Sequence, residues 1–220
     1  MLATPAPSPA ETRDNKAFDT LLWTLSRPGL PRDLPEQGEG SIITALLDRE
    51  CLVYAADPLL MPEIMRTGAE LADIDKADHV FLGAMATSDP LADIAIGSDY
   101  YPDDGATVII RAGVGSGPAL RLTGPGVNGS VTLQLEGLPD GFWKARAARL
   151  RYPMGFDLFF VDGSRVVGLP RSTTVEEIYW PMSQPAVANG PSSNQNVSFA
   201  KRWGALTAPA LKRSRKACPI

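Results

Sequence analysis

Residues that bind metals or form covalent cross-links are scarce in this chain of 220 residues, which contains two cysteines and one histidine. A zinc site takes about four ligands, mostly cysteine and histidine, and an iron–sulfur cluster takes about four cysteines. The sequence therefore predicts neither kind of centre. Cys51 lies in an apolar run and is expected to be a buried thiol, whereas Cys218 lies near the end of the chain. We expect no disulfide between them, because the sequence shows no export signal.

Long apolar segments are missing as well. The sequence has no run of about 18 apolar residues, which a membrane-spanning helix would need. Residues 1–10 are rich in alanine, proline and serine and lack the basic and apolar regions of a signal peptide. We therefore expect a cytoplasmic protein that has no membrane segment.

Acidic residues are absent from the last part of the chain. Residues 181–220 contain six lysines or arginines and no aspartate or glutamate, whereas residues 1–180 contain 15 basic and 25 acidic residues. Clustered cations bind the phosphates of nucleic acids, so the acidic body predicts no nucleic-acid partner. The basic tail is also rich in proline, serine and asparagine, and we expect it to be disordered and solvated, although it could touch an anionic partner.

Helical and strand patterns alternate along the middle of the chain. Helices are predicted over 15–26, 40–47, 58–71 and 138–150, and strands over 51–54, 79–83, 106–112, 119–123 and 131–135, followed by a hairpin within 152–174. In the first helix, the apolar face is expected to hold Phe18, Leu21, Leu22 and Leu25.

This interleaving of helices and strands is typical of an α/β fold, which we expect to be a three-layer sandwich with a mixed sheet. The predicted organisation is a flexible N-terminus at 1–14, a single α/β domain at 15–180 and the basic, disordered extension at 181–220.

One glycine-rich segment has the composition of a phosphate-binding loop, and a second is typical of a tight turn. Gly113–Gly117 is followed by Pro118 and a predicted strand, whereas a phosphate cradle needs a helix N-terminus at that point. A hairpin loop is the better interpretation of this segment. Gly124–Gly126 is typical of a β-turn after a strand. It is either a turn alone or a turn that lines a subunit interface or a ligand site.

Arg27 and Arg171 each adjoin a proline in a segment expected to be an ordered turn. A guanidinium fixed in this way can bind a carboxylate or phosphate through two parallel hydrogen bonds, or it can cap a helix or pair with an acidic residue. With the neighbouring turns, these arginines make up the predicted anion-binding or interface residues: Ser26, Arg27, Pro28, Gly29, Gly124, Pro125, Gly126 and Arg171.

The remaining polar groups do not form a recognisable active site. His79 adjoins Asp78 at a strand start, where a histidine is usually structural. The acidic residues around Asp103 are expected to form a solvated loop. We therefore predict no catalytic residue, no cofactor and no metal, which favours an assembly subunit with no complete active site of its own over a free-standing enzyme.

Three motifs occur in an order that resembles one known family. Leu25–Gly29 comes first, Leu122–Val127 follows, and Tyr152–Leu158 with Leu169–Thr173 comes last. In this order the motifs resemble the H subunit of the bacterial carbon–phosphorus lyase core complex, the PhnH family, over about residues 15–178. The tail has no counterpart in that family, and three positions depart from its usual residues: Met154, Phe156 and Ser172.

The resemblance implies a fold similar to that of pyridoxal-phosphate-dependent transferases but without the cofactor. It also implies association with the G, I and J subunits of the complex, and a homodimer when the chain is alone. With subunits G, I and L, the family is implicated in forming alpha-D-ribose 1-methylphosphonate 5-triphosphate from ATP and methylphosphonate. The alternatives are a stand-alone anion- or nucleotide-binding enzyme and a cofactor-free homodimer of unrelated metabolic role.

Overall fold

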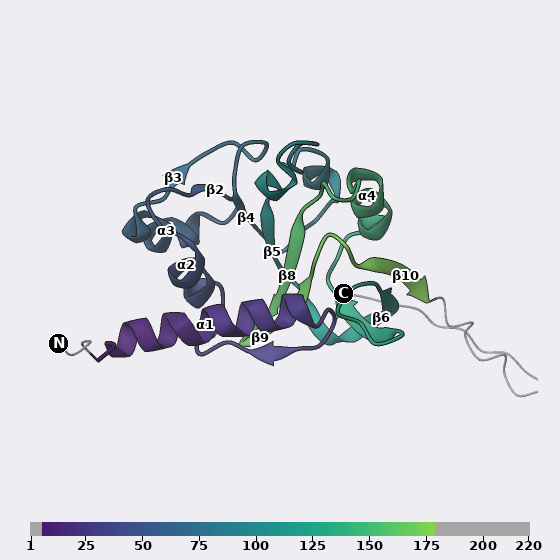
Figure 1. Cartoon of the computed structure of the whole chain (residues 1–220), viewed down its shortest axis with the longest axis horizontal. Helices are drawn as coiled ribbons and strands as arrows, with labels where there is room; N and C mark the ends of the chain where they lie inside the picture. Colours follow the sequence, from purple (N-terminus) through teal and green to yellow (C-terminus); the bar gives the residue numbers. More distant parts are fainter. Residues whose placement is uncertain (1–5, 179–220) are drawn as a thin grey trace, which may run out of the picture. The chain divides into compact units, whose positions relative to one another are not determined.

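The computed structural model describes residues 6–178, in which helices and strands alternate along the chain (Figure 1). The helices are α1 (Pro9–Ser26), α2 (Gly40–Leu46), α3 (Met61–Thr67) and α4 (Phe142–Arg149). The strands are β1 (Arg32–Asp33), β2 (Leu52–Ala55), β3 (Glu70–Leu71), β4 (His79–Gly83), β5 (Thr107–Arg111), β6 (Gly113–Thr123), β7 (Val131–Glu136), β8 (Asp157–Asp162), β9 (Arg165–Leu169) and β10 (Thr174–Ile178). Short 3-10 turns cover Pro58–Leu60, Asp89–Ala92 and Pro102–Asp104.

Ten strands form two sheets within the described residues. The larger sheet has the order β1-β9-β8-β5-β4-β2-β3, in which β3, β2, β4, β5 and β8 run parallel, whereas β9 is antiparallel to both β8 and β1. The smaller sheet is antiparallel and has the order β10-β6-β7. The predicted α/β fold with a mixed sheet is therefore confirmed.

Each face of the larger sheet is covered by a different layer. On one face, Phe81, Ile109 and Phe159 pack with buried residues of α1, α2 and α3. On the other face, Val108 and Phe160 pack with the smaller sheet and α4. Figure 1 shows β4, β5 and β8 between α2 and α3 on one side and α4 and β10 on the other. The second covering layer is thus mostly the smaller sheet. Strand β7 of that sheet buries alternate residues, so one of its faces is apolar and can pack against the larger sheet.

Helix α1 begins at Pro9 rather than at the predicted Asn15, so residues 9–14 of the segment expected to be flexible are helical. The Ser8 hydroxyl accepts a hydrogen bond from the Glu11 amide, and the Glu11 carboxylate accepts one from the Ser8 amide. This capping box satisfies two backbone donors that the first turn of a helix would otherwise leave unpaired. Pro9 has no N–H to leave unpaired there.

The buried face of α1 also differs from the prediction. Leu21 is buried with Ala17, but Phe18 and Leu22 are exposed. Small residues face the sheet because β9 passes very close to the helix: a Cβ on Gly168 would lie 2.8 Å from the Leu25 amide nitrogen. A large side chain in this contact would separate the helix from the sheet.

The predicted hairpin loop at Gly113–Gly117 is instead the first half of β6, which belongs to a different sheet from β5. The pairing of β6 with β7 shifts between Val114 and Ala119, and Gly115 and Gly117 adopt positive φ angles of 94° and 85° there. Glycine makes such an irregular strand possible. Residues 181–220 and Cys218, for which we predicted disorder, lie outside the described residues.

Among the described residues, no helix is both long and apolar enough to cross a bilayer.

Candidate functional site

The three sequence motifs meet in the fold although they are far apart in the chain. The Gly29 amide donates to the carbonyl oxygen of Gly168, at 3.3 Å, which joins the end of α1 to β9. A Cβ on Gly29 would collide with a methyl group of Leu122, which lies on β6. Gly29 has a φ of 81°, so both its conformation and its surroundings favour glycine.

The turn at Gly124–Gly126 packs against the other two motifs. A Cβ on Gly124 would lie 2.8 Å from the carbonyl oxygen of Ser172, and one on Gly126 would lie 2.6 Å from the carbonyl oxygen of Ser26. Both glycines have positive φ angles, of 130° and 80°. These close backbone contacts show that the turn is a packing element between motifs, in addition to ending β6.

Arg27 lies at the end of α1 with its side chain exposed. Its guanidinium carbon is 4.9 Å from the centroid of the Trp23 ring, and Nη1 donates to the Ser26 hydroxyl at 3.3 Å. Pro28 is buried behind it. The structure thus places the positive charge of Arg27 at the surface, stacked on an aromatic ring.

Arg171 is held by a carboxylate of its own chain. Its backbone N–H donates to Asp157 Oδ1 at 2.7 Å, and its Nη2 donates to Asp157 Oδ2 at 2.9 Å. Nη1 also donates to the carbonyl oxygen of Pro102. Much of the donor fork that would clamp an external anion is therefore engaged, and Arg171 ties the turn after β9 to β8.

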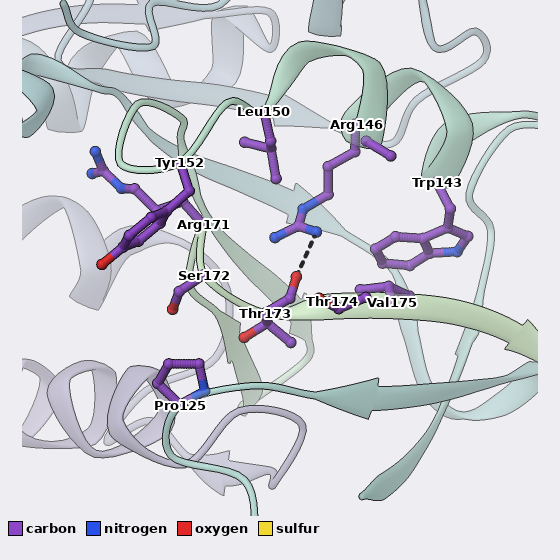
Figure 2. Close-up of a pocket in the computed structure, with 11 residues that line it drawn as sticks. Pro125, Trp143, Arg146, Leu150, Tyr152, Arg171, Ser172, Thr173, Thr174 and Val175 are labelled. Atoms are coloured by element: carbon purple, nitrogen blue, oxygen red, sulfur yellow. Dashed lines mark hydrogen bonds between the residues drawn. The ribbon is translucent and has the colours of Figure 1, made fainter. Parts of the chain in front are cut away.

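A cavity of about 500 Å³ opens beside this meeting point (Figure 2). Two of the predicted residues, Pro125 and Arg171, line it. The other walls come from α4, the segment after it and the start of β10, and include Trp143, Arg146, Leu150, Tyr152, Ser172, Thr173 and Val175. The volume is within the range of small-molecule sites in proteins.

The most unusual residue in the cavity wall is Arg146, which is 3% exposed. Figure 2 shows its side chain reaching from α4 toward the turn after β9. Nη1 donates to the carbonyl oxygen of Thr173 at 3.1 Å and Nη2 to that of Pro170 at 3.0 Å. Burial lowers the pKa of Arg146 to about 10, although the negative charge of Asp157 opposes this shift. The guanidinium is still a cation at neutral pH.

Two buried donors in this wall have no hydrogen-bond partner among the described residues: Arg146 Nε and the Thr173 hydroxyl. Most buried polar groups in proteins are paired, so these two atoms are exceptions, and each has almost no surface accessible from the cavity. The sequence prediction missed both residues. The available signal was spacing, because Arg146 follows the buried Phe142 by four positions and so lies on the inward face of α4.

The other polar groups singled out in the sequence lie elsewhere. His79 begins β4 and pairs with Val53 of β2. Burial lowers its pKa, although the negative charges of Asp78 and Asp48 oppose this. Asp99 pairs with Arg151 at the surface. Within residues 6–178, no group of three or more histidine, cysteine or acidic side chains is arranged to hold a metal ion.

Comparison with known proteins agrees with the motif order. Residues 8–176 match the family described as "Bacterial phosphonate metabolism protein (PhnH)". HtxG of Stutzerimonas stutzeri, whose name assigns it as a candidate C-P lyase subunit, is 35% identical over 173 residues, covering 74% of this chain and 86% of HtxG.

A second relative, from Rhizobium meliloti (strain 1021), is named alpha-D-ribose 1-methylphosphonate 5-triphosphate synthase subunit PhnH. It is 28% identical over 177 residues, covering 72% of this chain and 88% of the relative. The family match takes in α1 to β10, and therefore all three motifs and the cavity between them. The chain belongs to the PhnH family of bacterial phosphonate metabolism proteins.

Proposed function

We propose that this chain is a subunit of the carbon–phosphorus lyase core complex and acts with subunits G, I and L in forming alpha-D-ribose 1-methylphosphonate 5-triphosphate from ATP and methylphosphonate. The family match over residues 8–176 is the observation that supports this most strongly. The two named relatives are described as subunits of such a complex or synthase, and the chain covers most of each.

The chemistry of the cavity supports a substrate-organising role. Its wall includes the guanidinium-bearing residues Arg146 and Arg171. A guanidinium keeps its proton at neutral pH, so it can orient and stabilise an anion but is a poor general base. An acid–base pair or a nucleophile for a complete reaction would therefore come from another subunit.

The partners follow from the same proposal. The chain would associate with subunits G, I and J in the cytoplasm and would pair with itself when alone. Protein interfaces bury large apolar and aromatic side chains. Several such side chains are more than half exposed in the isolated chain and are available for these contacts: Leu22, Leu59, Met65, Tyr100, Tyr101 and Tyr152.

The fold would be similar to that of pyridoxal-phosphate-dependent transferases, with no cofactor bound. The mixed sheet with five neighbouring parallel strands is compatible with this relationship. A cofactor of this type is held through a lysine Schiff base. The two basic residues that line the cavity of Figure 2 are arginines, Arg146 and Arg171.

Growth on methylphosphonate as the sole phosphorus source tests the proposal. A strain that lacks this gene is expected to fail on methylphosphonate, to grow normally on inorganic phosphate and to recover when the full chain is supplied. Normal growth of the deletion strain on methylphosphonate would overturn the proposal.

A further inference from the structure

Three tyrosine side chains are strongly exposed and lie on two segments that touch each other. Tyr100 is 91% exposed, Tyr101 63% and Tyr152 74%. The Asp99 carboxylate accepts a hydrogen bond from Arg151 Nη2 at 3.1 Å. These two residues directly precede Tyr100 and Tyr152 in the chain, so their pairing brings the three tyrosines onto one surface, which we call the tyrosine surface. Large exposed side chains that gather in this way mark interaction sites, whereas scattered ones are normal.

The loop that carries Tyr100 and Tyr101 is fixed by contacts with its own chain. The Ser98 amide donates to the Tyr101 carbonyl oxygen at 2.9 Å, and the Tyr101 amide donates to the Ser98 hydroxyl at 3.1 Å. Arg171 Nη1 donates to the carbonyl oxygen of Pro102, which anchors the loop to the turn after β9. A surface that is ordered in advance loses less conformational entropy when a partner binds.

Two further residues of this loop, Asp103 and Asp104, give the tyrosine surface a negative charge. Both are exposed, and neither forms an ion pair within residues 6–178. Asp99, by contrast, is paired with Arg151. Carboxylates attract lysine and arginine side chains, and the faces of tyrosine rings attract the same cations. Both kinds of group on this surface therefore favour a basic partner.

The tyrosine surface borders the cavity of Figure 2. Tyr152 lines that cavity, and Figure 2 shows it on the side opposite Trp143. Arg171 lines the cavity as well, and it also holds the loop at Pro102. A protein bound at the tyrosine surface would thus lie at the edge of the cavity. In that position it would be able to supply the reactive groups that the proposed function requires from another subunit.

We propose that the tyrosine surface binds a basic segment of another protein subunit, whose lysine or arginine side chains contact the three tyrosine rings and pair with Asp103 and Asp104. This inference rests on the proposed function for the identity of the subunit, which would be G, I or J. The surface itself is argued from its exposure, order and charge. A second copy of this chain fits less well, because two such surfaces in contact would bring their carboxylates together.

The rate at which the other subunits leave this chain tests the surface. The full chain is co-expressed with subunits G, I and J and captured on a sensor through a tag, and release of the bound subunits into buffer is followed. Tyr100→Ala with Tyr101→Ala, and Asp103→Lys with Asp104→Lys, are each expected to speed release about tenfold or to prevent capture of a complex. Raising the salt from about 0.1 M to 1 M shortens the screening length from about 10 Å to 3 Å and is expected to speed release from the wild type, but to have much less effect on the aspartate variant.

Two controls alter matched groups elsewhere in the chain, and both are expected to release the subunits at the wild-type rate. Leu59→Ala removes an 82% exposed apolar side chain from the turn before α3, and Glu176→Lys with Glu177→Lys reverses two adjacent exposed acids on β10. Circular dichroism and thermal melting establish that each variant is folded. Release at the wild-type rate from either variant of the tyrosine surface would overturn this inference and leave the proposed function intact. Failure of the wild type to capture any of the three subunits would overturn both.

Discussion

Gly126 lies so close to the end of α1 that a Cβ built on it would be 2.6 Å from the carbonyl oxygen of Ser26. The atom in the way belongs to the backbone, and a side-chain rotation cannot relieve the contact. The turn of the second motif and the first motif are therefore fitted to each other at atomic distance. This contact explains why the turn after β6 needs a glycine where it meets the Ser-Arg-Pro-Gly segment, which lies about a hundred residues earlier in the chain.

Gly126→Ala is expected to destabilise the protein by about 2–4 kcal/mol, because it combines a positive φ with a backbone collision. Gly129→Ala is a matched control in the same loop, since Gly129 has a φ of 74° and nothing within 4 Å of its Cβ position. The control is expected to lose only about 1 kcal/mol. Urea unfolding measures both, and equal losses would contradict the close packing of the two motifs.

Arg171→Met is expected to cost about 2–3 kcal/mol, because it leaves the Asp157 carboxylate, which is 20% exposed, without its partner. The matched control is Arg151→Met, which breaks a pair with Asp99 whose side chains are 72% and 71% exposed. That change is expected to cost about 0–1 kcal/mol. If the two variants unfold at the same urea concentration, Arg171 is not the structural anchor that its contacts indicate.

Stability is expected to fall as the pH drops below about 6.5, because burial lowers the pKa of His79 in the folded chain. In this range the unfolded chain binds a proton more readily than the folded chain does, so stability increases with pH through the window and is complete above it. Asp78 and Asp48 oppose the shift but do not reverse it.

Urea unfolding of the wild type and of His79→Gln at pH values from about 7.5 to 5.5 measures this dependence. The variant is expected to show a flatter dependence over this range. The same slope in both proteins would assign the pH effect to other groups.

Local sequence patterns predicted the fold well where short-range physics decides it. His79–Gly83 is a strand with the predicted bounds, and α1 ends at Ser26 as the following proline indicates. The patterns failed where tertiary contacts decide. The buried face of α1 is set by its close approach to Gly168, and the path of β6 is set by its pairing with β7 and β10. Neither contact is encoded near the residues that it affects.

The candidate site likewise has features that local sequence predicts and features that depend on tertiary contacts. The glycines and prolines of the sequence predicted ordered turns at Gly124–Gly126 and around Arg27 and Arg171. The fold places these three segments in contact with one another. Local sequence could not show that Asp157 engages Arg171 while Arg146 has no carboxylate partner within residues 6–178, because ion pairing depends on long-range geometry. A charged residue four positions after a buried phenylalanine was the available clue.

Co-expression of the tagged full chain with subunits G, I and J, followed by size exclusion with mass detection, tests the central claim most directly. The account predicts one particle that contains all four proteins in fixed proportion. Elution of this chain as a homodimer, with the three other subunits in separate fractions, would contradict it.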